Sequence, residues 1–157
     1  MKKMNVGVIG VGYLGQFHAE KYAALPDARL VGIVDTDQAR GTSIATKLKT
    51  RWFPEPSGLL GSVDAVSIVV PTAFHHNVAM QFLQEGIHVL LEKPITVTLE
   101  QADQLINLAE KKKVILQVGH IERFNPALLA IKEHQDEPLF IRADRLAYDT
   151  PLDLATA

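Results

Sequence analysis

Three glycines with the spacing G-x-G-x-x-G could bind the phosphates of a nucleotide. They are Gly10, Gly12 and Gly15. An apolar run precedes them and a helical pattern follows, which is the order found in a dinucleotide-binding turn. Gly10 allows a tight turn, Gly12 lets the backbone approach a pyrophosphate, and Gly15 lets the new helix pack closely on the strand. We therefore expect the first N–H groups of that helix to face phosphates.

A carboxylate, Asp35, ends the next apolar run, 25 positions after Gly10. At the end of a second strand it is able to accept hydrogen bonds from both ribose hydroxyls of an adenosine, and it would repel a 2′-phosphate. The sequence therefore favours NAD over NADP. Arg40 is an argument for NADP instead, because a guanidinium near the ribose is able to bind a 2′-phosphate. The competing interpretation is an ordinary strand–turn–helix with a solvated aspartate.

The tripeptide Glu92-Lys93-Pro94 directly follows a buried strand pattern. Lys93 at this position is able to hydrogen-bond a substrate hydroxyl and to stabilise the alkoxide that develops as hydride leaves. Glu92 is expected to anchor Lys93 or the nicotinamide ribose, and Pro94 is a position for a cis peptide bond. The alternative is a helix-capping or surface loop without catalytic function.

Two further groups of polar residues follow strand patterns. They are Pro71, Thr72 and His75 in one group and His120, Arg123 and Asn125 in the other. Ligands of open α/β folds bind at the carboxyl ends of the strands, so the three groups are expected to share one crevice. His75 either approaches the cofactor or is a surface residue at a helix start. His120 and Arg123 face either the substrate cleft or a packed domain junction.

The predicted cofactor contacts are Gly10, Gly12, Tyr13, Leu14, Gly15, Asp35, Arg40, Pro71, Thr72, His75, Glu92 and Lys93. Lys93 is the predicted catalytic residue, and the second polar group is assigned to substrate. No His, Asp and Glu residues have metal-ligand spacing on one helix, so no catalytic metal is expected.

The elements that must position these residues alternate between strands and helices as far as residue 118. Strands are predicted at residues 28–34, 51–53, 65–70, 87–91 and 114–118, after the first strand that leads into Gly10. Helices are predicted at 13–24 and 37–49, around Phe74, Val78 and Phe82, and after a capping pattern of Thr98 and Gln101. This alternation predicts an α/β fold, a Rossmann-like doubly wound parallel sheet.

Inward-facing positions are predicted for the second helix and the fourth helix. They are Ala39, Ile44, Ala45 and Leu48 in one, and Leu99, Ala102, Leu105 or Ile106, and Ala109 in the other.

The pattern changes after residue 121. Residues 127–134 are predicted to be helical, and residues 139–148 form a long strand pattern without a partner strand in the sequence. A single strand is marginal alone. We therefore divide the chain into a dinucleotide-binding domain, 1–121, and the beginning of an incomplete α+β domain for substrate binding and oligomerisation, 122–157.

Composition excludes several classes of function. The 157 residues are 47% hydrophobic and 22% charged with a net charge of −2, so neither a nucleic acid nor an anionic membrane is an expected partner. No apolar run approaches the ~20 residues of a membrane span. The chain has no cysteine, which excludes disulfides and thiolate sites and fits a cytoplasmic location.

These motifs together resemble the Gfo/Idh/MocA family of oxidoreductases. The similarity covers nearly the whole chain: the three glycines, His18-Ala19, Asp35, Pro71 with His75, the run 85–94 that ends in Glu-Lys-Pro, and the run 119–126. Within the family, residues 118–127 are most similar to bacterial members that oxidise the 3-hydroxyl of UDP-N-acetylglucosamine-type sugar nucleotides.

The resemblance implies NAD held by the first domain, and a sugar or sugar-nucleotide substrate between it and a larger second domain. Lys93 matches the family lysine that contacts the reacting hydroxyl. Family members are about twice as long, and their second domain carries a histidine as acid/base, for which this sequence has no counterpart. They oligomerise through the sheet of that domain, so a homo-oligomer remains an open expectation here.

Two hypotheses follow. The first is the cofactor-binding part of an NAD-dependent sugar dehydrogenase that transfers hydride between a hydroxyl-bearing carbon and nicotinamide. The second is a non-catalytic, stand-alone NAD-binding or sensor module, which the missing histidine favours and the Lys93 site disfavours.

Overall fold

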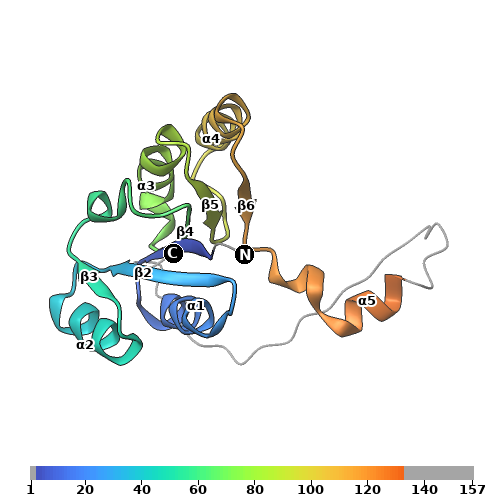
Figure 1. Cartoon of the computed structure of the whole chain (residues 1–157). Coiled ribbons are helices and arrows are strands. Elements are labelled where there is room, and N and C mark those ends of the chain that lie inside the picture. The colour runs from blue at the N-terminus through green and yellow to red at the C-terminus, as the bar shows by residue number, and fades with distance from the viewer. Residues whose placement is uncertain (1–2, 133–157) are drawn as a thin grey trace, which may run out of the picture. The chain divides into compact units, whose positions relative to one another are not determined.

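The structure is a computed structural model that describes residues 3–132. Within this range, six parallel strands form a sheet in the order β3–β2–β1–β4–β5–β6 (Figure 1). The strands are β1 (Met4–Ile9), β2 (Ala28–Val34), β3 (Arg51–Phe53), β4 (Ala65–Ile68), β5 (His88–Leu91) and β6 (Leu116–Val118). This is the strand order of a dinucleotide-binding fold, and it confirms the predicted Rossmann-like sheet.

Four helices cover the two faces of the sheet. They are α1 (Tyr13–Ala24), α2 (Gln38–Leu48), α3 (Thr72–Gln84) and α4 (Leu99–Lys112). Figure 1 shows α1 and α2 on one face and α3 and α4 on the other. Successive strand residues point to opposite faces, so Val8 of β1 joins the core with α1 and α2, and Ile9 joins the core with α3 and α4. This burial on both sides explains why the strands are apolar runs without alternation.

Local signals set the helix ends, and the predicted capping pattern of Thr98 and Gln101 is one of them. The Thr98 hydroxyl accepts the N–H of Gln101 (3.3 Å) at the start of α4, and the Asp37 carboxylate accepts the N–H of Arg40 (3.0 Å) at the start of α2. Gly86 follows α3 with a φ of 74°, a conformation that glycine adopts without strain.

Two predicted inward-facing positions, Ala39 and Leu99, are wrong, and Phe74 of the apolar helical period is exposed as well. Leu99 is 81% exposed and Phe74 57% exposed, and Ala39 is also exposed, whereas Leu105 is fully buried. Each exposed residue lies in the first turn of its helix. These first turns stand at the carboxyl edge of the strands, where the helix has less sheet to pack against. The helical period predicts the buried side of a helix but not where the sheet under it ends.

The strand at 65–70 is also shorter than predicted, since β4 ends at Ile68. Val69 still donates its N–H to the Ile9 carbonyl oxygen of β1 (2.8 Å) at the carboxyl edge of the sheet. Within the described residues, no helix has the length and apolar character needed to cross a membrane.

The chain divides into two compact units, of which the first ends at Gly119 and the second begins at His120. The described part of the second unit holds a 3₁₀ helix (Ile121–Phe124) and α5 (Pro126–Lys132). The helix expected at 127–134 is therefore present at its start. The strand expected at 139–148 lies outside the described residues.

Candidate functional site

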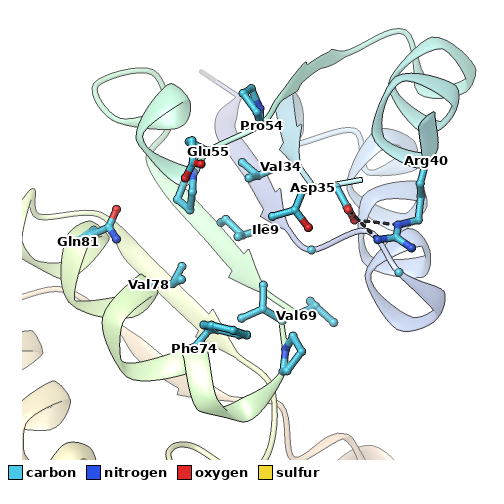
Figure 2. Close-up of a pocket in the computed structure, with 16 residues that line it drawn as sticks. Ile9, Val34, Asp35, Arg40, Pro54, Glu55, Val69, Phe74, Val78 and Gln81 are labelled. Atoms are coloured by element: carbon cyan, nitrogen blue, oxygen red, sulfur yellow. Dashed lines mark hydrogen bonds and ion pairs between the residues drawn. The ribbon is translucent and has the colours of Figure 1, made fainter. Parts of the chain in front are cut away.

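A cavity of about 510 Å³ opens at the carboxyl edge of the sheet (Figure 2). It lies where β1 and β4 are neighbours and where the chain leaves for opposite faces, to α1 after β1 and to α3 after β4. Such a switch point is where open α/β sheets bind ligands. The lining residues are Ile9, Gly10, Gly12, Val34, Asp35, Thr36, Arg40, Pro54, Glu55, Pro56, Val69, Val70, Pro71, Phe74, Val78 and Gln81.

The glycine turn is packed so closely that it leaves space only on its outer side. Gly10 has a φ of 81°, and a Cβ there would collide with the Val69 carbonyl oxygen. A Cβ on Gly15 would collide with the carbonyl oxygen of Gly10. A Cβ on Gly12, in contrast, would meet no protein atom within 4 Å. Packing therefore explains Gly10 and Gly15, and the free space at Gly12 fits a pyrophosphate beside the start of α1.

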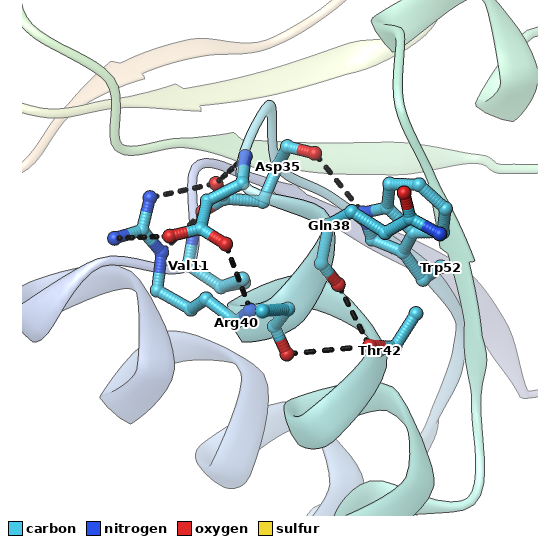
Figure 3. A network of polar contacts seen from close by, with 8 residues as sticks. Val11, Asp35, Gln38, Arg40, Thr42 and Trp52 are labelled. Carbon is cyan, nitrogen blue, oxygen red and sulfur yellow. Dashed lines mark hydrogen bonds and ion pairs between the residues drawn. The ribbon is translucent and has the colours of Figure 1, made fainter.

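Asp35, directly after β2, is a carboxylate of the cavity lining that accepts four hydrogen bonds (Figure 3). Its Oδ2 accepts the N–H of Val11 (3.0 Å) and Arg40 Nε (3.0 Å). Its Oδ1 accepts the N–H of Asp37 (2.8 Å) and Arg40 Nη2 (2.7 Å). Burial by itself would raise the pKa of Asp35, but the bonds from Arg40, Asp37 and Val11 outweigh it and hold the pKa below its usual value.

Trp52 of β3 fixes the backbone at the same point. Its indole N–H donates to the Asp35 carbonyl oxygen (3.0 Å), and its ring lies where a Cβ on Gly41 of α2 would be. Trp52 is the only tryptophan of the sequence. Its fluorescence therefore reports on the end of β2 without labelling.

His75 is buried and lies between two loops at the edge of the sheet. Its Nδ1 faces the Pro94 carbonyl oxygen (2.9 Å) and its Nε2 faces the Val70 carbonyl oxygen (2.8 Å). The side chain thus ties the loop after β4 to the loop that carries Lys93, and it is not a residue of the cavity wall. The surface position considered for His75 is wrong, because the side chain is 1% exposed.

Glu92, after β5, is buried in a second polar network. Its Oε1 lies 3.3 Å from His18 Nε2, and His18 Nδ1 lies 2.9 Å from the Ser67 hydroxyl, which Tyr22 also approaches (3.3 Å). Burial lowers the pKa of His18 by more than the nearby Glu92 carboxylate raises it. A neutral His18 suits these partners, because Nε2–H donates to Glu92 while Nδ1 accepts the Ser67 proton. A Cβ on Gly119 would come within 2.6 Å of Glu92 Oε1, so this glycine leaves room for the carboxylate.

The structure brings some of the predicted cofactor contacts together. Gly10, Gly12, Asp35, Arg40 and Pro71 line the cavity. The other predicted contacts lie outside its lining: Tyr13, Leu14, Gly15, Thr72, His75, Glu92 and Lys93. Lys93 is exposed after β5, joined to Pro94 by a cis peptide bond, and its N–H lies 3.4 Å from Glu92 Oε2. The roles assigned to these residues remain predictions.

The three predicted substrate residues belong to the second unit. The carbonyl oxygen of His120 accepts the N–H of Arg123 (3.1 Å). The side chain of Asn125 donates to Glu122 (2.8 Å) and accepts the N–H of Ala127 (3.0 Å) at the start of α5. Their local contacts stabilise a turn and a helix start, and their assignment to substrate remains a prediction.

Sequence reasoning missed several cavity and network residues. Pro54, Glu55 and Pro56 follow β3, and their position after a strand was the available signal. His18 and Tyr22 lie four residues apart and therefore share one side of α1, which indicates a common partner. Among residues 3–132, no three His, Cys, Asp or Glu side chains gather as metal ligands.

Substitution of two glycines separates packing from binding. We expect Gly15→Ala to destabilise the fold by about 3 kcal/mol or more, because the new methyl group meets backbone that cannot move away. Gly12→Ala should change stability by less than about 1 kcal/mol yet weaken NADH binding at least about tenfold. Thermal unfolding and an NADH titration of both variants measure the two effects. Normal NADH binding by a folded Gly12→Ala variant would contradict the prediction that the pyrophosphate lies beside Gly12.

The pKa of Asp35 predicts a pH-dependent contribution to stability. Because this pKa is lower in the folded chain, the ionised carboxylate stabilises the fold at neutral pH, and the stabilisation is lost as the pH falls below about 4. We expect Asp35→Asn to lower the free energy of unfolding by about 1–3 kcal/mol at pH 7. Denaturant unfolding of both proteins from pH 7 to pH 3 should show this difference shrinking; a constant difference would contradict it.

Comparisons with known proteins agree with this geometry. Residues 4–120 match the family model described as "Oxidoreductase family, NAD-binding Rossmann fold". UDP-N-acetylglucosamine 3-dehydrogenase of Acidithiobacillus ferrooxidans is 44% identical over 155 residues, covering 98% of this chain and 49% of that protein. The scyllo-inositol 2-dehydrogenase (NAD(+)) of Bacillus subtilis is 32% identical over 138 residues, covering 85% of this chain and 40% of that protein.

Solved structures show the same similarity. The structure of the Acidithiobacillus ferrooxidans enzyme has a TM-score of 0.80 at 46% identity, covering 85% of this chain and 44% of that chain. GenD2 from gentamicin A biosynthesis, solved in complex with NAD, has a TM-score of 0.82 at 31% identity, covering 85% of this chain and 39% of that chain. The chain spans about half the length, or less, of these relatives. It belongs to the Gfo/Idh/MocA family of oxidoreductases and carries the NAD-binding Rossmann fold of that family.

Proposed function

We propose that this chain is the cofactor-binding part of an NAD-dependent dehydrogenase that acts on a hydroxyl group of a sugar or sugar nucleotide. The observation that carries the proposal is the cavity at the switch point, which joins the open side of Gly12 to the Asp35 carboxylate. A dinucleotide needs a backbone surface for its pyrophosphate and a carboxylate for its ribose hydroxyls, and this cavity offers both.

Each part of the chain has a defined task in this proposal. The first N–H groups of α1, from Tyr13 on, bind the pyrophosphate, because a helix leaves them without intrahelical partners. Asp35 binds the adenosine ribose at the other end of the cavity. The bound nicotinamide supplies the hydride acceptor.

Lys93 is assigned to the substrate hydroxyl. It stands exposed at the carboxyl end of β5, and its ammonium is able to donate a hydrogen bond to the hydroxyl and stabilise the developing alkoxide. Glu92 and His75 support it by fixing the two ends of its loop. The resemblance to the family assigns the proton acceptor to a histidine of the second domain.

The substrate class follows from the relatives and not from the cavity. A sugar nucleotide is our first choice, because the 44% identical relative is a UDP-N-acetylglucosamine 3-dehydrogenase. We assign residues 1–121 to the dinucleotide-binding domain and 122–157 to the start of the substrate and oligomerisation domain, with His120, Arg123 and Asn125 at the substrate. A cytoplasmic location, based on the absence of cysteine, completes the proposal.

A titration with NADH tests the proposal directly. Energy transfer from Trp52 should quench its emission as NADH binds, because its indole contacts the backbone of Asp35. We expect saturable binding by this chain. Asp35→Ala should weaken NADH binding about tenfold and NADPH binding less, since the lost carboxylate favours ribose hydroxyls and repels a 2′-phosphate.

Lys47→Met is a suitable control, because Lys47 lies on α2 and pairs with Glu20 (2.8 Å), not with a residue of the cavity lining. It should bind both nucleotides as the wild type does. Absence of NADH binding by a folded wild-type chain would contradict the proposed function, and an unchanged nucleotide preference in Asp35→Ala would contradict the ribose assignment alone.

A further inference from the structure

The Asp35 carboxylate has no acceptor position left for a ribose. An ionised carboxylate offers about four lone-pair positions on its two oxygens. Two accept backbone N–H groups of Val11 and Asp37, and two accept Nε and Nη2 of Arg40, at 2.7–3.0 Å. The two ribose hydroxyls of a bound dinucleotide therefore need positions that this structure assigns to a side chain of the same protein.

Of these donors, only the guanidinium is able to leave. Val11 lies in the glycine turn and Asp37 is the N-cap of α2, so both N–H groups are fixed by the fold. The Arg40 side chain, in contrast, is 44% exposed, whereas that of Asp35 is 4% exposed. Arg40 Nη1 also lies 3.7 Å from Oδ2 of the half-exposed Asp37, which offers the guanidinium a second partner at the rim.

Arg40 is the residue of the cavity lining whose charge favours a 2′-phosphate. Arg40 is the only lysine or arginine among the lining residues within the described chain, and the lining carboxylates are Asp35 and Glu55. Figure 2 shows the guanidinium on Asp35 at one end of the cavity and Glu55 away from it. A 2′-phosphate entering this end has no other cationic partner in the lining, and a guanidinium is able to bind a phosphate in a bidentate manner.

We propose that Arg40 takes the place of the ribose hydroxyls on Asp35 in the free protein and sets the ratio of NADH to NADPH affinity. This inference rests on the proposed function. A dinucleotide with a free 2′-hydroxyl displaces the guanidinium and loses two charge-assisted hydrogen bonds. A dinucleotide with a 2′-phosphate keeps the guanidinium, which has five N–H donors and bridges phosphate and carboxylate. Arg40 therefore weakens NADH binding and strengthens NADPH binding.

Arg40→Met tests the proposal, because methionine keeps much of the side-chain length and removes the charge. We expect NADH to bind about threefold to tenfold tighter than to the wild type and NADPH to bind at least about tenfold more weakly. Isothermal calorimetry and Trp52 emission give both dissociation constants without any turnover. Arg40→Lys keeps the charge but loses the planar fork, so its NADPH affinity should lie between those of the wild type and Arg40→Met.

Arg29→Met is the matched control for loss of a positive charge. Arg29 is an exposed residue of β2 outside the cavity lining, and this variant should change neither affinity by more than about twofold. Equal or weaker NADH binding by Arg40→Met, with an unchanged ratio to NADPH, would overturn the proposal while leaving the proposed function in place. A folded wild type that binds neither nucleotide would overturn both.

Discussion

The contact between the glycine turn and the end of β4 is the constraint on which the rest of the nucleotide site depends. Gly10 lies so close to the Val69 carbonyl, and Gly15 so close to the Gly10 carbonyl, that a Cβ would fit at neither position. This packing lets α1 begin directly beside the edge of the sheet. The same turn directs the Val11 N–H at Asp35 and leaves the open side of Gly12 toward the cavity. One close approach thus positions Gly12 and Asp35, the proposed pyrophosphate and ribose contacts, together.

The topology and the main chemical groups of this site follow from sequence patterns. The glycine spacing predicted the turn and the start of α1, and the apolar runs predicted the six strands in their order along the chain. Spacing is sufficient here because each feature depends on residues close together in the chain. Asp35 was identified for the same reason, since it follows directly on β2.

The contacts within the site could not be predicted in this way. The bidentate pair of Arg40 with Asp35 depends on how far α2 turns back over the end of β2, which no local pattern specifies. His75 meets Pro94 across 19 positions, and His18 meets Ser67 across 49. Phe74 fits the apolar helical period but lies at the cavity, because periodicity does not show where the sheet ends. Long-range polar pairs and the edge of the sheet therefore needed the three-dimensional structure.

The two buried carboxylates at this edge show how similar sequence positions acquire different tasks. Asp35 and Glu92 each follow a buried strand directly, and each is less than 10% exposed. Asp35 is balanced by a guanidinium that is partly in water, which, in our proposal, ribose hydroxyls displace from the carboxylate. Glu92 instead accepts a hydrogen bond from neutral His18, a side chain only 17% exposed, which is itself held by Ser67 on the central strand β4. A ligand is able to replace the first partner but not the second. The exchangeable carboxylate therefore lines the cavity, and the fixed one supports the loop of Lys93.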